Sequence, residues 1–251
     1  MVYPASIFIT GANRGIGLGL VREFLKVSSV KHVIAGTRNP DGGKELNEIK
    51  DSRLKVVQVD IGCDNSIKSA YAQVESVVGE GGLNVLLNNA AILTPYFTSR
   101  AISREAFMNC INVNLLGTAI VSQTFLPLLL KASSHTADDH IGVDRAAIVN
   151  ISATWGSIGR NADGSGPMGA LAYKVSKAGL NQLGKTMAID LKGDKILVVQ
   201  FCPGWVKTDL GGKAATDTVE VATSGLVKAM SSLGKEHSGG FFDRRLKAIP
   251  Y

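Results

Sequence analysis

The chain contains little cysteine, and its cysteines and histidines lack the spacings typical of metal sites. Only three of the 251 residues are cysteine, at Cys63, Cys110 and Cys202. An odd number without a CxxC pair argues against a disulfide framework and indicates free thiols in a reducing compartment. The four histidines show no ligand spacing either, so we expect no metal.

Targeting signals and long apolar runs are also missing from the pattern. The N-terminal stretch MVYPASIFITGANRG has no charged region ahead of its short apolar run, unlike a signal peptide. Nowhere do about 18 apolar residues follow one another, so we expect no membrane contact. The final IPY is neither a prenylation nor a peroxisomal signal. From these absences we expect a cytoplasmic protein.

The net charge is positive but not concentrated. Lysine and arginine together number 27 against 21 acidic residues, which gives a formal charge of +6. No run of five cations occurs, and aromatic residues do not alternate with them, so we expect no nucleic-acid partner. We interpret the charge as a solvated surface with a pocket for an anionic ligand, with nucleic acid as the alternative.

Short apolar runs alternate with helical segments along the chain. The runs are near-continuous, as in strands buried on both faces, and they cover residues 6–10, 32–37, 54–60, 83–89, 146–152 and 195–201. The main segments with helical character are 17–26, 65–78, 104–130 and 170–192. This alternation predicts an α/β fold, a doubly wound parallel sheet with helices on both faces. No composition break or repeat interrupts it, so we predict one domain over residues 1–251.

A glycine-rich turn follows the first apolar run. Residues 10–17 read TGANRGIG and lead into a helix. Glycines at such a turn let the backbone approach a pyrophosphate, which then lies at the positive end of the helix. The spacing GxxxGxG differs from the common GxGxxG, and no Lys-Ser/Thr pair follows, which disfavours an ATP-type phosphate loop. The turn predicts a dinucleotide site.

The second run ends in a basic residue and predicts the choice of cofactor. Arg38 follows this run, with no acid before Asp41. An acid there binds the ribose 2′-hydroxyl of NAD, whereas a basic residue accommodates a 2′-phosphate. Arg14 supplies a second guanidinium, so the pair favours NADP(H); two surface arginines are the alternative. Asp60 is placed to contact the adenine, or instead to cap the helix that begins near Asn65.

Tyr173 and Lys177 lie four residues apart and share one helix face. A phenol with an ordinary pKa of about 10, placed beside a permanent cation, could serve as a proton donor tuned toward neutral pH. An ammonium about 4 Å from a phenol is worth roughly 4 kcal/mol at an effective dielectric of about 20. That attraction predicts a tyrosine pKa lowered by up to about 3 pH units. We interpret the pair as a tuned acid; an amphipathic surface pair is the alternative.

Several motifs occur in one order along essentially the whole chain. They are TGxxxGxG at 10–17, Asn88-Asn89-Ala90, Asn114, Ser152, Tyr173-x-x-x-Lys177 and Pro203-Gly204. Together they resemble the short-chain dehydrogenase/reductase family. Within that family, the segments that resemble sniffer-type carbonyl reductases are NPDGGKEL, GLNVLLNNA, VDRAAIVNIS, PGWVKTDLGG and GGFF. The resemblance implies a Rossmann fold and NADPH-dependent reduction of a carbonyl.

The resemblance also implies a role for each motif residue. Tyr173 is the expected proton donor, Ser152 hydrogen-bonds the substrate carbonyl, Lys177 holds the nicotinamide ribose, and Asn114 anchors a water in a proton relay. The residues expected to bind NADP(H) are Gly11, Asn13, Arg14, Gly15, Ile16, Gly17, Arg38, Asp60, Ile61, Asn88, Ala90, Tyr173, Lys177, Pro203, Gly204, Val206 and Thr208.

Two of these roles and one nearby thiol have plainer alternatives. Asn88 with its neighbour could merely end a strand, and Asn114 could bond a nearby backbone carbonyl. Cys202 is expected to be a small buried apolar residue, since no histidine lies near it in sequence to activate a nucleophile.

The chain departs from the family pattern in two places. Ala91 stands where the family usually has glycine, which puts a methyl group near the cofactor. The segment between Ser152 and Tyr173 is longer than usual, and its glycines at 156, 159, 164 and 166 predict a pliable loop that could act as a lid. The residues that it adds to the mouth of the site are Trp155, Arg160, Asn161, Asp163 and Met168.

These features together predict a reductase of a small, apolar or aromatic aldehyde, ketone or quinone. The apolar residues expected near the strand ends are Leu93, Tyr96, Phe97, Trp155, Met168, Trp205 and Leu210. The alternative is an NADP(H)-binding sensor or scaffold with little or no catalysis; a nucleotide-sugar epimerase is disfavoured by the short chain. The resemblance implies a homodimer through the helix that carries Tyr173, unless the preceding loop blocks pairing and leaves a monomer.

Overall fold

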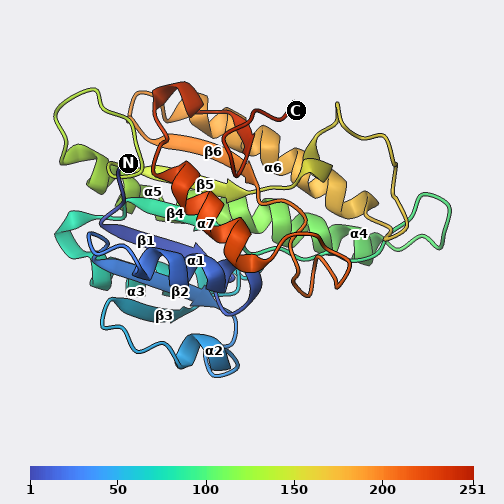
Figure 1. The fold of residues 1–251 in the computed structure, drawn as a ribbon, viewed down its shortest axis with the longest axis horizontal. Coiled ribbons are helices and arrows are strands. Elements are labelled where there is room, and N and C mark those ends of the chain that lie inside the picture. The colour runs from blue at the N-terminus through green and yellow to red at the C-terminus, as the bar shows by residue number, and fades with distance from the viewer.

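One seven-stranded sheet forms the centre of the protein (Figure 1). The computed structural model describes all residues from 1 to 251. The strands are β1 Ser6–Thr10, β2 His32–Thr37, β3 Leu54–Gln58, β4 Val85–Asn88, β5 Ala147–Ile151, β6 Leu197–Cys202 and β7 Phe241–Asp243. They pair in the order β3-β2-β1-β4-β5-β6-β7, and every pair is parallel. The predicted doubly wound Rossmann fold is confirmed.

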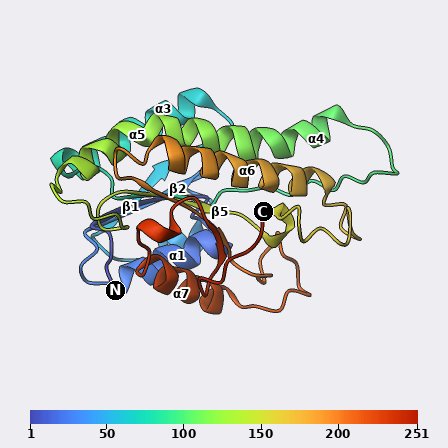
Figure 2. The ribbon, with the colours of Figure 1, turned by 90° about the horizontal axis from the view of Figure 1, so that it is seen from above.

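Helices cover both faces of this sheet (Figure 2). The α-helices are α1 Gly15–Leu25, α2 Lys44–Asn47, α3 Asp64–Val78, α4 Arg104–Ile111, α5 Thr118–Ser134, α6 Leu171–Asp190 and α7 Val219–Met230. A π-helical segment, Asn112–Gly117, joins α4 to α5, and short 3₁₀ turns lie at Gly79–Gly81, Thr154–Gly156 and Lys235–His237. Helices α3, α4, α5 and α6 lie on one face, whereas α1 and α7 lie on the other.

All six predicted strands are present, although most are shorter than their apolar runs. Strand β3, for example, ends at Gln58 rather than at Asp60. Helices α2 and α7 and strand β7 were not predicted. The first and the last of these contain only four and three residues, too few for a periodic signal. Helix α7 buries its apolar face against α1, where Gly19 leaves room: a Cβ there would lie 2.5 Å from Val219 Cγ1.

Three buried amide side chains form a polar row across the middle of the sheet. Asn88, Asn150 and Gln200 are register partners in β4, β5 and β6. Asn88 Nδ2 donates to Asn150 Oδ1 at 2.9 Å, and Asn150 Nδ2 donates to Gln200 Oε1 at 3.3 Å. Asn88 also donates to Ser122 Oγ of α5. The asparagine that ends β4 therefore does more than end it, because it connects two strands and a helix.

The continuous helical segment Arg104–Ser134 is long and apolar enough, by length and composition alone, to cross a membrane. Its most apolar stretch has a mean hydropathy of 1.6, and 44% of that stretch is buried inside the protein. Buried core helices of soluble proteins meet the same criterion, so the finding is weak evidence for a membrane.

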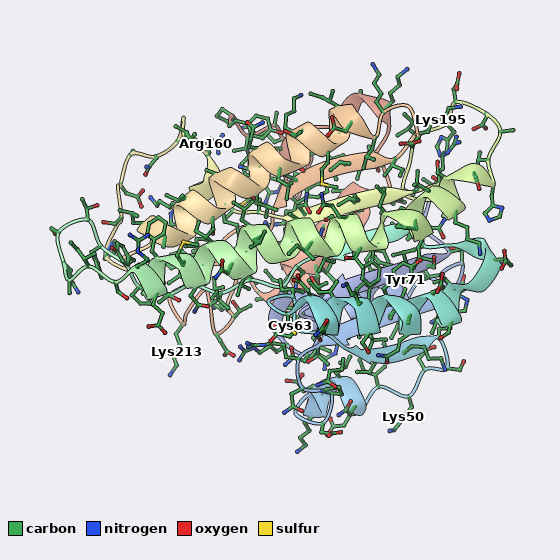
Figure 3. The ribbon with its side chains drawn as sticks, turned by 180° about the vertical axis from the view of Figure 1, so that it is seen from behind. Lys50, Cys63, Tyr71, Arg160, Lys195 and Lys213 are labelled. Carbon is green, nitrogen blue, oxygen red and sulfur yellow. The ribbon has the colours of Figure 1, made fainter.

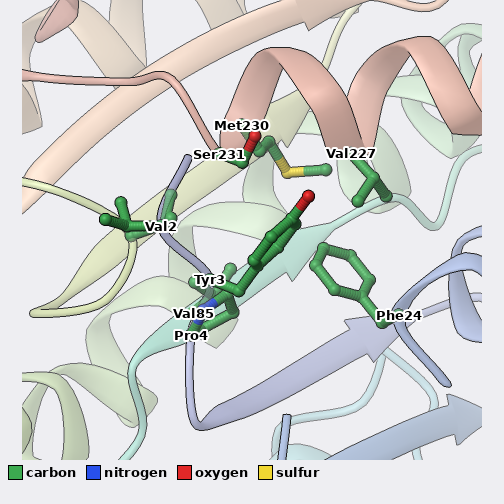
Figure 4. A pocket seen from close by; sticks show the side chains of 9 residues that line it. Val2, Tyr3, Pro4, Phe24, Val85, Val227, Met230 and Ser231 are labelled. Carbon is green, nitrogen blue, oxygen red and sulfur yellow. The ribbon is translucent and has the colours of Figure 1, made fainter. Parts of the chain in front are cut away.

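An apolar crevice lies at the amino ends of the strands, away from the glycine turn (Figure 4). Tyr3 extends across it between Phe24 and the last turns of α7, and Val2 N donates to Ser231 O. The crevice has no room for a water molecule. It is therefore part of the packing of the N-terminal segment and not a binding site.

Candidate active site

The carboxyl ends of the parallel strands bring the predicted motifs to one edge of the sheet, on the right in Figure 1. The glycine turn follows β1, Ala90 follows β4, Ser152 follows β5, and Pro203 follows β6. Ligands of open α/β sheets bind at this edge, where the strand order reverses around the first strand. The fold alone therefore gathers residues from four separate parts of the sequence.

The glycine turn packs tightly against the segment after β4. Gly11 has a φ of +66°, and a Cβ there would lie 2.9 Å from the Cα of Ala90. Asn89 Nδ2 donates to the carbonyls of Thr10 and Gly11, and these hydrogen bonds hold the turn against the segment after β4. Helix α1 then begins at Gly15 without a side-chain cap, so its first amides remain available. A close-packed turn that ends in uncapped amides fits the pyrophosphate of a dinucleotide.

The two predicted arginines differ in their surroundings. Arg14 Nη1 lies 2.6 Å from Asp209 Oδ2, in an exposed ion pair with the segment after β6. That segment lies over the start of α1, because a Cβ at Gly15 would be 3.1 Å from Thr208 Cγ2. Arg38 is exposed at the end of β2 and forms no ion pair. Arg38 is thus the freer of the two cations.

Asp60 does not cap α3, so that alternative is wrong. Its Oδ1 accepts a hydrogen bond from Gly62 N at 2.9 Å, and its backbone N donates to Ser66 Oγ. The residue before α3 is Cys63, which provides no side-chain cap. The carboxylate of Asp60 therefore accepts a hydrogen bond within its own turn. The residue is half-buried at the edge of the sheet where we expected the adenine.

Ser152 is buried and its hydroxyl already has a partner. Its backbone N donates to Phe201 O, which continues the pairing of β5 with β6. Its Oγ donates to Oδ1 of Asn181 at 2.7 Å, and Asn181 Nδ2 donates to Gly156 O. Asn181 was not among the predicted site residues. The available signal was its position four residues after Lys177 on the same helix face.

Tyr173 and Lys177 lie together on α6, but their electrostatics differ from the prediction. Lys177 Nζ lies 5.7 Å from the centre of the Tyr173 ring and donates to Ile151 O at 2.7 Å. Burial lowers the pKa of Lys177 to about 8. Burial also raises the pKa of Tyr173, so the predicted lowering is wrong. Loss of hydration outweighs attraction here, because the phenol has left water and the ammonium is turned toward a backbone carbonyl.

The hydroxyl of Tyr173 has no hydrogen-bond partner within the protein, although the residue is only 6% exposed. No buried side-chain nitrogen or oxygen lacks a partner, so this hydroxyl must reach the open edge of the site. The rings of Trp155 and Tyr173 pack nearly perpendicular to each other, with ring centres 6.1 Å apart. The phenol is therefore enclosed on its sides and open at its oxygen.

Asn114 lies in the π-helical segment and is fully buried. Its side chain bonds both backbone groups of Ile92, and its Nδ2 also donates to Ser176 Oγ at 3.0 Å. Asn114 therefore bonds a backbone carbonyl, which lies in the segment after β4 and not in its own helix. Its expected role in a proton relay stays a prediction. Through these bonds the widened helical turn joins the segment after β4 to α6.

The loop between Ser152 and α6 is anchored at several points, unlike the pliable loop that its glycines suggest. Lys174 Nζ donates to Asn161 Oδ1 at 3.0 Å and to Asp163 Oδ1. Gly159 N donates to Tyr251 O, and Arg160 lies on the loop beside the first turns of α6 (Figure 3). A hollow of about 230 Å³ here is lined by Thr154, Trp155, Arg160, Asn161, Ala162, Asp163 and Lys174.

The expected apolar residues divide into supports and exposed groups. Tyr96 pairs with the loop through Gly169 O, and Phe97 packs where a Cβ of Gly169 would lie, 2.5 Å from Phe97 Cε2. Trp205 is 48% exposed beside the site, and Leu210 is 36% exposed. Tyr96 and Phe97 thus hold the segment after β4 against the loop that precedes α6, whereas Trp205 and Leu210 present apolar surface.

Cys202 and Gly204 both support the end of β6. Cys202 is 5% exposed, as expected of a small buried apolar residue, and its Sγ lies 3.0 Å from Thr154 Oγ1. Gly204 has a φ of +95°, and a Cβ there would lie 2.2 Å from Arg244 Nη1. Arg244 pairs with Asp217 and donates to Pro203 O. No local pattern in the sequence indicates this ion pair.

Comparison with known proteins identifies the family. The model of the short chain dehydrogenase family matches residues 5–218. The short-chain dehydrogenase anuI of Penicillium roqueforti is 29% identical over 231 residues, which cover 89% of this chain and 87% of that protein.

Solved structures agree in fold over the whole chain. A Caenorhabditis elegans protein named as a Sniffer carbonyl reductase is 40% identical, with a TM-score of 0.94 and complete coverage of both chains. An NADPH-bound carbonyl reductase from chicken fatty liver is 34% identical with a TM-score of 0.95, covering 100% of this chain and 96% of that one. With these similarities and the family match, the chain belongs to the short-chain dehydrogenase family.

Proposed function

We propose that the protein is an NADPH-dependent carbonyl reductase that acts through residues 1–251 as one catalytic domain. The observation that carries this proposal is the Tyr173 phenol, which is buried beside Lys177 and has a hydroxyl free of protein partners. The carbonyl reductases that the chain resembles, one of them solved with NADPH, support the same reaction.

Bound NADPH would supply the hydride. The protein would supply the groups that meet the charge left on the carbonyl oxygen. Ser152 Oγ donates a hydrogen bond to that oxygen, and Tyr173 gives it a proton. The raised pKa of Tyr173 favours this direction, because the phenol keeps its proton at neutral pH and can release it only to a strong base such as an alkoxide. Lys177, still mainly protonated below pH 8, supplies positive charge beside the phenol.

The cofactor would lie along the edge that the glycine turn begins. The uncapped amides of α1 hold the pyrophosphate, and Arg38 with Arg14 binds the 2′-phosphate, which favours NADP(H) over NAD(H). The remaining contacts that we propose come from Gly11, Asn13, Gly15, Ile16, Gly17, Asp60, Ile61, Asn88, Ala90, Pro203, Gly204, Val206 and Thr208. Lys177 holds the nicotinamide ribose from α6.

The substrate would be a small apolar or aromatic aldehyde, ketone or quinone. Trp155 packs against Tyr173, and the half-exposed Trp205 and Leu210 present apolar surface beside the same strand ends. Aromatic and apolar side chains of this kind usually line small-molecule pockets and leave orientation to a few polar groups.

Loss of absorbance at 340 nm tests the proposal directly. The purified protein is mixed with NADPH or NADH and a panel of aldehydes, diketones and quinones. We expect turnover with NADPH preferred, and a fall in kcat of about 10²-fold or more in Tyr173→Phe. NADPH binding without turnover of any carbonyl would instead support a cofactor sensor or scaffold, and full activity in Tyr173→Phe would refute the assigned proton donor.

A further inference from the structure

Ser152 and Asn181 form a buried pair whose hydrogen-bond directions are fixed. Asn181 is 2% exposed, and its Nδ2 donates to Gly156 O at 3.1 Å. Because a carbonyl accepts only from a donor, the amide must present its nitrogen to Gly156 and its oxygen to Ser152. An amide oxygen in turn only accepts, so the hydroxyl hydrogen of Ser152 points at Asn181.

The surrounding backbone keeps the side-chain amide of Asn181 from rotating by 180°, which would exchange its oxygen and nitrogen. The turn Thr154–Gly156 lies directly on α6, since a Cβ at Gly156 would be 2.8 Å from the carbonyl carbon of Lys177. This contact brings the Gly156 carbonyl within reach of Asn181. Tyr173, Lys177 and Asn181 follow one another at intervals of four residues, so one face of α6 carries all three.

A substrate carbonyl oxygen is also only an acceptor. It therefore competes with Asn181 for the single hydrogen of Ser152. We propose that Asn181 is a positioning residue for the reaction. It holds Oγ of Ser152 in place and accepts the hydrogen bond from this hydroxyl until the substrate carbonyl oxygen replaces Asn181 as the acceptor. This inference rests on the proposed carbonyl reduction, in which Ser152 contacts the reacting oxygen and Asn181 does not.

A double-mutant cycle separates this role from simple structural support. Removing one donor to a developing oxyanion costs about 10²- to 10³-fold in rate, which is the expected effect of Ser152→Ala. We expect Asn181→Ala to lower kcat/KM by about tenfold, because a displaced donor loses part of that contribution. In the Ser152→Ala background, Asn181→Ala should change kcat/KM by less than about twofold, since the residue acts through Ser152. Equal losses in both backgrounds, or no loss in either, would overturn the proposal.

Asn181→Asp provides a rescue that depends on pH. A protonated carboxyl group has the same shape as the amide, and it can donate to Gly156 O while accepting from Ser152. An ionised carboxylate cannot donate, and it faces the Gly156 carbonyl. We expect the variant to approach wild-type kcat/KM at low pH and to lose activity through one additional titration as pH rises. A variant with the wild-type pH profile would contradict the proposed hydrogen-bond directions.

Gln182→Ala is the matched control. This neighbouring amide is exposed and bonds only Thr186 Oγ1 on the same helix. We expect unchanged kcat, KM and melting temperature. Melting temperatures of every variant show whether it folds, and the Asp variant keeps the test decisive if Asn181→Ala does not fold.

A measurement without turnover distinguishes failure of this inference from failure of the proposed function. The side-chain amide resonance that is absent in Asn181→Ala identifies Asn181 in the ¹⁵N spectrum. This resonance should shift in Ser152→Ala, because the amide oxygen loses its partner. Wild-type protein that reduces no carbonyl would refute the proposed function, whereas an unshifted resonance would refute the pairing itself.

Discussion

Replacement of Lys177 by methionine should make the protein more stable while removing its activity. Burial lowers the pKa of this lysine from 10.5 to about 8. At 1.36 kcal/mol per pH unit, that difference corresponds to a cost of about 3 kcal/mol for keeping the charged form in the folded state at pH 7. Methionine avoids this cost but loses the hydrogen bond from Nζ to Ile151 O, worth about 2 kcal/mol for a charged donor. The net expectation is a gain of about 1 kcal/mol at pH 7.

The pH dependence of this difference is the stricter test. Between pH 8 and 10.5 the unfolded chain binds a proton at this lysine and the folded chain does not, so the wild-type free energy of unfolding rises with pH. The free energy of unfolding of the variant relative to wild type should therefore fall by about 2 kcal/mol from pH 7 to pH 9.5, so that wild type becomes the more stable protein by about 1 kcal/mol at pH 9.5. The other titratable groups contribute equally to the free energy of unfolding of both proteins, so their contributions cancel in this difference.

Urea unfolding of the cofactor-free proteins, followed by tryptophan fluorescence at pH 7 and pH 9.5, measures both quantities. Lys185→Met, at an exposed lysine of the same helix, is the control and should leave the pH dependence unchanged. A stability difference that is the same at the two pH values would show that Lys177 is not held in a desolvated, charged state.

Three further changes have definite expected results. Arg38→Ala should raise the Kd for NADPH by about tenfold and leave that for NADH within about twofold, by fluorescence titration, because only the 2′-phosphate loses a partner. Asp209→Asn removes the exposed partner of Arg14 and should change the free energy of unfolding by less than about 1 kcal/mol in urea. A larger loss would mean that this pair holds the segment after β6. Gly204→Ala should lower the free energy of unfolding by at least about 2 kcal/mol, since it combines a positive φ with a clash at Arg244, and an unchanged urea midpoint would contradict that packing.

Local patterns in the sequence predicted most of the fold and singled out the candidate site residues. Strands β1 to β6 and the longer helices follow from apolar periodicity, which neighbouring residues determine. The glycine turn and the Tyr173–Lys177 spacing are local signals as well. The direction of the Tyr173 pKa was not predictable in this way, because it depends on how completely the folded chain removes the phenol from water.

Contacts between residues far apart in the sequence were also not predictable. Ser152 and Asn181 are 29 positions apart, and Arg14 and Asp209 are 195 positions apart. No periodic pattern indicates which polar groups the fold brings together over such distances. The short elements α2 and β7 were not predicted for a related reason, since tertiary packing and not local preference determines them.

The row of amides across the sheet determines how accurately the strand ends align. Each member lies two positions before a residue that ends or follows its strand: Asn88 before Ala90, Asn150 before Ser152, and Gln200 before Cys202. A slip of one residue in any of the three strands would turn its amide to the other face and leave buried polar groups without partners. The correct alignment of Ser152 with the segment after β4 is therefore enforced during folding, inside the sheet and without any ligand. An engineer who transplants one of these strands from a relative must keep all three amides or replace them together.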